Sequence, residues 1–275
     1  MGGEQNRAFH IDAFRDLIYD YYRSHGRVLP WRLTQDPYCI LVSEIMLQQT
    51  QVDRVLGKYG PFIETFPDFP SLAVAPVESV LRNWQGLGYN RRALALKKTA
   101  VRVVDEFQGR LPDDPGVLVT LSGIGTATAS SIAAFAFNMP VVFIETNIRT
   151  VFIHFFFEGQ EFVTDSEILP LVEESLDADN PRDWYYALMD YGSMLKKAGD
   201  RGHRRSGSYR KQSTFYGSDR QVRGAILRLL LAEKTLSTDA LTDRSGQPEE
   251  KVLRILSELE KEGFVLVSDG SVAIT

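Results

Sequence analysis

The chain has 275 residues, of which 44% are hydrophobic and 24% charged, a composition typical of a folded globular protein and not of a disordered one. It has no apolar run of about 18 residues, and its start, MGGEQNRAFH, lacks a basic flank followed by an apolar stretch, so we expect neither a membrane span nor a secretory signal. The single cysteine, Cys39, and four scattered histidines exclude a disulfide within the sequence and predict no metal site, no iron–sulfur cluster and no other cofactor in a reducing, cytoplasmic setting.

The net charge of −5 argues against a nucleic-acid partner only as an average, because the charges are segregated along the chain. Residues 196–223 hold nine Lys or Arg against two Asp, whereas residues 233–262 hold eight acids against five bases. The sequence therefore predicts one basic segment that could contact an anionic partner.

Apolar residues at spacings of three and four predict helices along most of the chain before residue 198. The predicted helical segments are FRDLIYDYYRSH, VSEIMLQQTQVDRVLGKYGPFIETF, SLAVAPVESVLRNW, RRALALKKTAVRVVDEF, TATASSIAAFAF, TNIRTVFIHFFF, SEILPLVEESL and DWYYALMDYGSMLKK. Strand-like alternation is nearly absent before residue 263, so the fold is predicted to be mainly α. FIHFFF and WYYALMDYGSMLKK are predicted to pack in the core, with Asp190 as a buried polar anchor.

The C-terminal part of the chain has a different pattern. Residues 199–218 show no period and are predicted to be an irregular basic connector, which divides the chain into domains at 1–198 and 219–275. The later domain is predicted to contain helices at about 219–233, 237–243 and 248–262 and a hairpin around SDGS, an order typical of a winged helix. It could read DNA or pack on the helical domain, and the acidic outer face of its third helix favours packing.

The stretch SEIMLQQTQV places Glu44 among apolar residues and follows it with amides. Either a helix emerges there from the core into solvent, or Glu44 is a catalytic acid beside amides that contact a base. In the second case we expect desolvation to raise the pKa of Glu44 and keep a proton available near neutral pH.

Two further motifs could carry chemistry. LSGIGTATA places Gly123 and Gly125 before a helix opened by Thr126, which is either a plain turn or a helix-hairpin-helix that holds a DNA phosphate through backbone amides. Glu145 lies about twenty residues later, before another helix, and is either an ordinary capping neighbour or a second catalytic carboxylate. Two carboxylates and a phosphate-binding hairpin suffice to cleave a glycosidic bond through an oxocarbenium-like sugar.

These blocks, with LPWR, NWQGLGYNRRALAL and ETNIRTV, resemble the helix-hairpin-helix base-excision DNA glycosylases over roughly residues 10–197. Within that superfamily they are most similar to MutY-type adenine DNA glycosylases. The resemblance implies a two-lobed, mainly α fold with its active site in a cleft, and removal of adenine opposite 8-oxoguanine after base flipping. It also implies double-stranded DNA containing a mismatch or oxidised base as the partner, a monomeric enzyme and, in a prokaryote, association with the nucleoid.

The resemblance also assigns roles to particular residues. Glu44 corresponds to the general acid, Glu145 to the carboxylate that stabilises the sugar, and Asn147 to the amide beside it. Gln49 and Thr50 correspond to residues that insert at the lesion, and Leu87 and Tyr89 to a second wedge. The complete set of expected DNA-binding residues is Gln48, Gln49, Thr50, Leu87, Tyr89, Gly123, Gly125, Arg32, Arg204 and Arg205.

The chain departs from the family pattern in three places. Glu145 stands where the family has aspartate, and the extra methylene moves the carboxylate by more than about 1 Å. The basic stretch AGDRGHRRSGSYRKQS replaces the four-cysteine iron–sulfur loop, and it either packs without metal and contacts phosphates or is a solvated linker. The family's C-terminal reader of 8-oxoguanine has no evident counterpart; the winged-helix-like tail stands in its place.

Ala127 occupies the position of the nucleophilic lysine in lyase-competent relatives resembling endonuclease III. We therefore expect a monofunctional glycosylase without strong strand-cleaving activity. Removal of a mispaired adenine opposite 8-oxoguanine or guanine is the leading hypothesis. A glycosylase of the same fold acting on another base, or a non-catalytic DNA-binding relative, remains the alternative.

Overall fold

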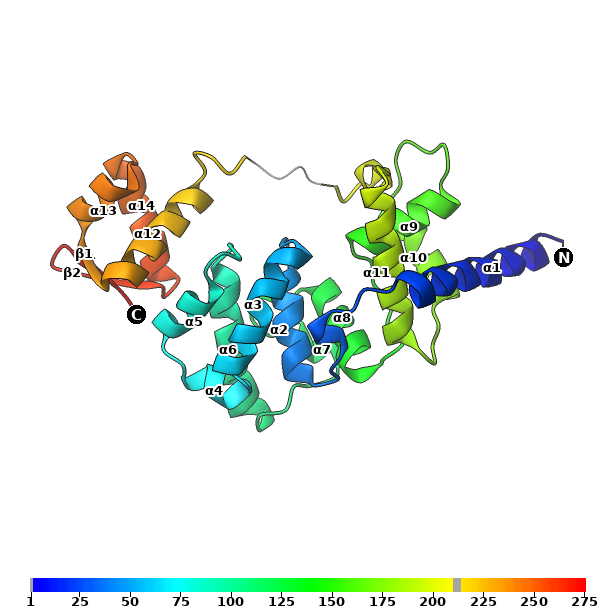
Figure 1. Ribbon diagram of the computed structural model, residues 1–275, viewed down its shortest axis with the longest axis horizontal. Coiled ribbons are helices and arrows are strands. Elements are labelled where there is room, and N and C mark those ends of the chain that lie inside the picture. The colour runs from blue at the N-terminus through cyan, green and yellow to red at the C-terminus, as the bar shows by residue number, and fades with distance from the viewer. Residues whose placement is uncertain (1, 210–213) are drawn as a thin grey trace. The chain divides into compact units, whose positions relative to one another are not determined.

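The computed structural model describes residues 2–209 and 214–275 and is mainly helical, as the periodicity predicts (Figure 1). Up to residue 197 its elements are α1 (Gly2–His25), η1 (Pro30–Arg32), α2 (Pro37–Leu47), α3 (Val52–Thr65), α4 (Phe69–Val74), α5 (Val77–Trp84), α6 (Arg91–Phe107), α7 (Pro115–Leu118), α8 (Thr126–Phe137), α9 (Thr146–Phe156), α10 (Asp165–Ser175) and α11 (Pro181–Lys197). They are followed by η2 (Gly202–Arg205), α12 (Asp219–Glu233), β1 (Thr235–Ser237), α13 (Thr238–Ser245), α14 (Glu249–Lys261), β2 (Val265–Ser268) and β3 (Ser271–Ile274).

The chain forms two compact units, each built from separate stretches of sequence. The first unit contains Met1–Leu41, Asp113–Thr120 and Ile124–Lys211, and the second contains Val42–Pro112, Leu121–Gly123 and Gln212–Thr275. Glu145 therefore belongs to the first unit and Glu44 to the second.

The core of the first unit is aromatic and joins α1, α9 and α11. The ring of Phe14 meets Phe152 edge-on at 5.4 Å and Trp184 at 5.9 Å between centroids. Phe152 and Trp184 are fully buried, which confirms that FIHFFF and the α11 segment supply core side chains. Arg15 ties α1 to the end of α10 by donating to the backbone oxygens of Ser175 and Leu176, both at 2.8 Å.

The second unit buries the apolar side of α6 against its neighbouring helices. Phe62 of α3 and Trp84 of α5 are fully buried and meet at 5.9 Å between ring centroids. The hydroxyl of Thr99 on α6 donates to the backbone oxygen of Ser122 at 3.0 Å. That contact attaches the segment before Gly123 to the middle of α6.

The C-terminal tail, residues 214–275 here, has the predicted winged-helix order of elements. Its sheet is antiparallel with strand order β1-β3-β2, and Val265 of β2 pairs with Ile274 of β3. The short strand β1, which pairs Thr235 with Ala273, was not predicted, because three residues are too few for an alternating pattern to be recognised. In Figure 1 these elements run from gold to red.

Two long helices predicted from periodicity are each interrupted. The segment 42–66 ends as α2 at Leu47 and restarts as α3 at Val52, with Gln49 at a φ of 53° between them. The prediction that SEIMLQQTQV is one helix is therefore wrong, because a residue in the left-handed region ends a helix. The segment 71–84 divides into α4 and α5 at Pro76, whose ring cannot continue the hydrogen-bond ladder.

The connector is ordered where it is described. Val163 donates its N–H to the backbone oxygen of Arg205 at 2.9 Å and accepts from Gly207 at 3.0 Å. The Ser208 hydroxyl donates to Asp165 at 2.8 Å. A solvated linker is thus excluded for residues 199–209; residues 210–213 of the predicted connector lie outside the described part of the chain.

No helix in the described part of the chain combines the length and the apolar content that a bilayer crossing needs.

Candidate active site and DNA interface

Glu44 lies on the last turn and a half of α2, at the border of the apolar core of the second unit. Its own side chain is half-buried, whereas Ser43, Ile45 and Met46 around it are at most 1% exposed. The α2 backbone therefore holds the carboxylate on a rigid element with apolar neighbours on both sides. The role of Glu44 as a general acid stays a prediction that this position allows.

The buried guanidinium of Arg92 joins the two loops that were predicted to act as wedges. Its Nη1 donates to the backbone oxygens of Ile45, Met46 and Gln48 at 2.6–2.8 Å, which closes the end of α2. Its Nη2 donates to the Thr50 hydroxyl at 2.9 Å and to the backbone oxygens of Leu87 and Gly88 at 3.3 and 3.1 Å.

Arg92 was not singled out from the sequence, where RR at the start of α6 looks like an exposed basic pair. Burial lowers the pKa of Arg92 to about 10, so the side chain is cationic at neutral pH. A planar fork of donors is needed to reach acceptors on two sides at once, and lysine lacks that geometry. The two loops are therefore one structural unit built around Arg92.

The predicted wedge residues differ in how they are presented. Gln49 is exposed and Tyr89 is partly exposed, and both have a positive φ, 53° and 47°. Leu87 is only 2% exposed, with its backbone oxygen taken by Arg92. The prediction that Leu87 enters the base stack gains no support from this geometry, because its side chain is part of the core.

The first half of the glycine hairpin belongs to the second unit and packs tightly there. Gly123 has a φ of 78°, and a Cβ on it would lie 2.7 Å from the Cβ of Ala95. Its backbone oxygen accepts from Nε2 of Gln48 at 3.1 Å. Gly123 is therefore required both by its backbone conformation and by its close approach to α6.

In the first unit, Gly125 is the N-cap of α8, and Thr126 and Ala127 are exposed in its first turn. A hydrogen bond from the Arg182 side chain to the Phe135 backbone oxygen at 2.6 Å closes the other end of the same helix. The exposed start of α8 is a helix N-terminus, the kind of helix end at which anions bind.

Glu145 is the N-cap of α9, and its carboxylate is held by three donors. Oε1 accepts from the backbone N–H groups of Asn147 and Ile148 at 2.7 and 3.0 Å, and Oε2 accepts from Nδ2 of Asn147 at 3.2 Å. The capping interpretation of Glu145 is confirmed, and the cap fixes the orientation of the carboxylate. Its catalytic role stays a prediction.

Lys196, on α11, interacts electrostatically with the carboxylate of Glu145, and this interaction was missed from the sequence. Burial lowers the pKa of Lys196, and the charge of Glu145 opposes that shift. A lysine near the end of a core helix gives no sequence signal for this role.

Arg32 and Asp190 form a buried ion pair in the first unit. Nη1 and Nη2 of Arg32 donate to the two carboxylate oxygens, each at 2.9 Å, and Arg27 adds contacts at 2.6 and 2.7 Å. The Arg32 side chain is 6% exposed and lies 4.3 Å from the centroid of the Tyr186 ring. Asp190 is confirmed as a buried anchor. The Arg32 guanidinium is engaged by that carboxylate within the first unit, so the geometry gives no support to an exposed phosphate contact by Arg32.

The two arginines expected to bind DNA from the connector are not equivalent. Arg205 donates from Nη1 to the backbone oxygens of Phe157 and Gln160 at 3.0 and 2.8 Å, which attaches η2 to the end of α9. Arg204 is exposed. The DNA contact stays a prediction for the exposed Arg204, whereas the Arg205 guanidinium is already engaged by the protein.

Comparison with known proteins gives the family. Residues 42–245 match the family described as HhH-GPD superfamily base excision DNA repair protein. The chain belongs to this superfamily. The match includes Glu44, the glycine hairpin, Glu145 and the tail as far as α13.

The superfamily members most similar in sequence include adenine DNA glycosylases. The protein of Mycolicibacterium smegmatis is 35% identical over 82% of this chain and 83% of its own length. The protein of Buchnera aphidicola subsp. Baizongia pistaciae is 34% identical over 66% of this chain, and the human protein 32% over 67%. The chain spans about half of the Buchnera relative, 53%, and 36% of the human one.

Solved structures of the superfamily share the fold. A thermostable thymine-DNA glycosylase matches with a TM-score of 0.60 and 25% identity, over 67% of this chain and 87% of that one. A trapped endonuclease III–DNA covalent intermediate matches with a TM-score of 0.54 and 18% identity over 68% of this chain. The prediction of a mainly α, helix-hairpin-helix glycosylase fold is confirmed.

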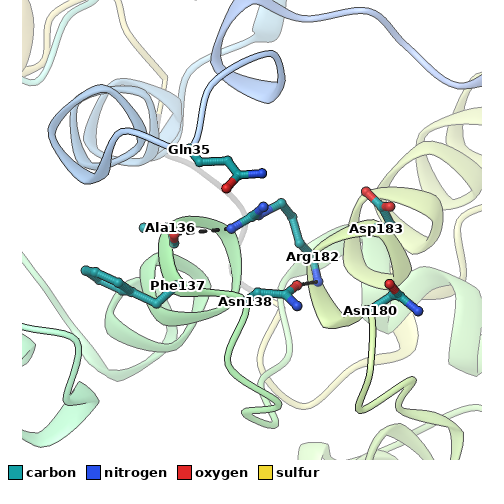
Figure 2. Close-up of a pocket in the computed structure, with 7 residues that line it drawn as sticks. All are labelled: Gln35, Ala136, Phe137, Asn138, Asn180, Arg182 and Asp183. Carbon is teal, nitrogen blue, oxygen red and sulfur yellow. Dashed lines mark hydrogen bonds between the residues drawn. The ribbon is translucent and has the colours of Figure 1, made fainter.

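A pocket of about 360 Å³ lies in the first unit between the end of α8 and the start of α11 (Figure 2). Glu44, the glycine hairpin and Glu145 are not among the residues that line it. The stick view shows Arg182 turned toward the end of α8, with its guanidinium bonded to Ala136. Among residues 2–209 and 214–275, no group of three or more His, Cys, Asp or Glu side chains is arranged to hold a metal ion.

Proposed function

We propose that the protein is a monofunctional DNA glycosylase that hydrolyses the N-glycosidic bond of a mispaired adenine opposite 8-oxoguanine or guanine. The observation that carries the proposal is Glu145, whose carboxylate is held by two backbone donors and the Asn147 amide at the start of α9. Similarity to adenine DNA glycosylases over 82% of the chain supports the choice of base.

In this mechanism Glu44 donates a proton to the adenine ring, so that the base leaves as a neutral molecule. Glu145 stabilises the oxocarbenium-like sugar and the attacking water completes the hydrolysis. A carboxylate that is already oriented needs no reorganisation as positive charge develops, and such preorganised groups contribute strongly to catalysis.

The handling of DNA is assigned to the loops around Arg92. Gln49 and Tyr89 are exposed or partly exposed on these loops, in backbone conformations fixed by the arginine, and Gln48 is bonded to the glycine hairpin. Extrusion of a base costs a few kcal/mol, and wedge residues on a rigid support offset that cost. Gly123, Gly125 and Arg204 would contact the phosphates on the flanks.

The test is a single-turnover assay on duplexes that carry adenine opposite 8-oxoguanine, guanine or thymine, and thymine or uracil opposite guanine. Release of adenine from the first two, reduced by at least about a hundredfold in Glu44→Gln, is expected. Arg54→Lys, an exposed change on α3, is the matched control. An undiminished rate in Glu44→Gln would overturn the mechanism.

A second candidate is removal of a different base by the same machinery. It is favoured by the 87% coverage of the thymine-DNA glycosylase structure and by a tail whose pattern differs from the family's 8-oxoguanine reader. Release of thymine rather than adenine in the same panel would decide for it. Product from no duplex, with DNA still bound, would leave a non-catalytic relative.

A further inference from the structure

An arginine of the C-terminal tail contacts the predicted wedge residue Tyr89, within the second unit. A guanidinium N–H of Arg220, in the first turn of α12, donates to the Tyr89 hydroxyl. The same guanidinium lies 5.2 Å from the centroid of the Tyr89 ring and 5.4 Å from that of Phe215. Hydrogen bonding and cation–π contact therefore act on one tyrosine from one side chain.

Tyr89 is held from a second direction by Arg92, whose guanidinium lies 5.6 Å from the ring centroid. The loop that carries Tyr89 contains two glycines, Gly86 and Gly88, with φ values of 94° and 74°. Tyr89 itself has a φ of 47°. A tyrosine in the left-handed region is conformationally costly and persists only where its surroundings hold it. Arg220 and Arg92 are those surroundings.

The tail is attached beside this loop by charged contacts. Arg91, two residues after Tyr89, forms a two-pronged ion pair with Glu262 at 2.9 and 2.6 Å, and Arg223 of α12 contacts the same carboxylate at 2.5 Å. Arg82 of α5 donates to the backbone oxygen of Leu231 at 2.8 Å. These contacts fix α12 relative to the start of α6, which places Arg220 against the wedge loop.

Two aromatic side chains extend the contact toward solvent. Phe215 is 58% exposed and Tyr216 is 88% exposed, directly before α12. Exposed aromatic rings beside arginine are the groups on which unstacked bases and the backbone of DNA are held. The acidic face of α14, which is unfavourable for a DNA groove, is not required for this arrangement.

We propose that the C-terminal tail is part of the base-extrusion machinery, with Arg220 as a positioning residue that holds Tyr89 in its wedge conformation. The proposal rests on the proposed function of Tyr89 as a wedge. It assigns to this tail a role in extrusion that does not depend on reading the opposite base. Loss of the contact should weaken extrusion without altering the carboxylates Glu44 and Glu145.

The experiment uses the full-length protein and a duplex with 2-aminopurine beside the mispaired adenine, whose fluorescence rises when the neighbouring base leaves the stack. Arg220→Ala is expected to lower the extruded fraction by about threefold to thirtyfold, the loss of a cation–π contact and a charged hydrogen bond. Arg220→Lys keeps the charge but not the planar fork, so it should also lower the extruded fraction, by most of the amount seen for Arg220→Ala. Arg228→Ala, an exposed change on the same helix, should behave as wild type.

A double-mutant cycle separates positioning from general stability. In a Tyr89→Ala background, Arg220→Ala should have no further effect on fluorescence, because there is no ring left to hold. The same full effect in that background, or wild-type fluorescence in Arg220→Ala, would overturn the proposal. If the cycle shows that Arg220 and Tyr89 are coupled but no base is released from any duplex, the proposed glycosylase function alone is contradicted. If Arg220→Ala releases the base at the wild-type rate, the positioning role alone is contradicted.

Discussion

A Cβ on Gly192 would lie 2.4 Å from the backbone oxygen of Asn147 and 2.8 Å from its Cβ. Gly192 is buried on α11, and Asn147 is in the first turn of α9, where it donates to Glu145. The missing side chain is therefore what lets the start of α9 lie against α11. Because backbone atoms cannot give way cheaply, any larger residue at 192 must move the helix start that orients Glu145.

We expect Gly192→Ala to lower the single-turnover rate by about a hundredfold, since a shift on the order of 1 Å at a catalytic group has that effect. DNA affinity should change little. Gly57→Ala on α3 is the control, because no atom lies within 4 Å of a Cβ there, and it should stabilise the protein by about 0.5–1 kcal/mol. Equal rates for Gly192→Ala and wild type would contradict the positioning of α9 by this contact.

The capping and chemical roles of Glu145 can be separated by two substitutions. Glu145→Ala removes the N-cap and should cost about 1 kcal/mol of unfolding free energy along with activity. Glu145→Gln keeps an acceptor oxygen for the N–H groups of Asn147 and Ile148, so the stability should be nearly retained while the rate falls by at least about a hundredfold. Urea denaturation and single-turnover release of base measure the two effects. A Gln variant that is as active as wild type would show that only the cap matters.

Substitution of Arg92 should uncouple the two wedge loops. Arg92→Lys removes the planar fork of donors. One arm of that fork reaches three backbone oxygens at the end of α2, and the other reaches Thr50, Leu87 and Gly88. We expect a loss of about 2–4 kcal/mol in stability from the unsatisfied carbonyls, and a larger loss of 2-aminopurine fluorescence on lesion DNA than the instability explains. Arg54→Lys, exposed on α3, should change neither. A fluorescence loss no greater than the unfolded fraction would refute the coupling.

The pH dependence of stability should reveal the Asp190 ion pair. Burial raises the pKa of Asp190, but the hydrogen bonds and charges of Arg32 and Arg27 outweigh it and hold the pKa below its ordinary value. The stability contributed by the ionised carboxylate is therefore fully present above the unfolded-state pKa of about 3.9 and is lost as the pH falls through the lower folded-state pKa.

Asp190→Asn should cost about 3–5 kcal/mol at neutral pH, because the buried guanidinium of Arg32 and the half-buried one of Arg27 lose their counter-charge. The difference between wild type and variant should shrink as the pH falls below about 4, measured by urea denaturation. Asp113→Asn, at an exposed position, is the control, and its unfolding free energy should differ little from that of wild type. A difference for Asp190→Asn that stays constant with pH would contradict the ion pair as the cause.

The absence of lyase activity is expected from Ala127, exposed in the first turn of α8. Alanine offers no amine to attack the sugar, so borohydride should not trap wild type on lesion DNA. Ala127→Lys should form a detectable covalent adduct on gel electrophoresis. Trapping of wild type as strongly as of the lysine variant would show that another amine, such as that of Lys196, reaches the sugar.

The helical architecture was predictable from the chain because long apolar periods are local signals. Segments such as α6 and α8 carry both the period and their end signals within their own residues, and their predicted bounds match the structure. The order of elements in the tail followed from the same kind of information, except for β1, whose three residues are too short to show a pattern. The interruption at Gln49 was missed because glutamine is not an obvious helix breaker.

The sequence by itself determined which residue types are available: two carboxylates in suitable contexts, a glycine hairpin, and an alanine where a nucleophile would stand. Only the tertiary structure decided how they are supported, since Arg92, Gly192 and Arg220 act on partners 40 or more residues away along the chain. It also decided that Leu87 and the Arg205 guanidinium are engaged within the protein while Gln49 is exposed. Burial and long-range hydrogen bonds arise from the packed chain as a whole. The local sequence therefore does not show that Arg92 is buried while its neighbour Arg91 is exposed.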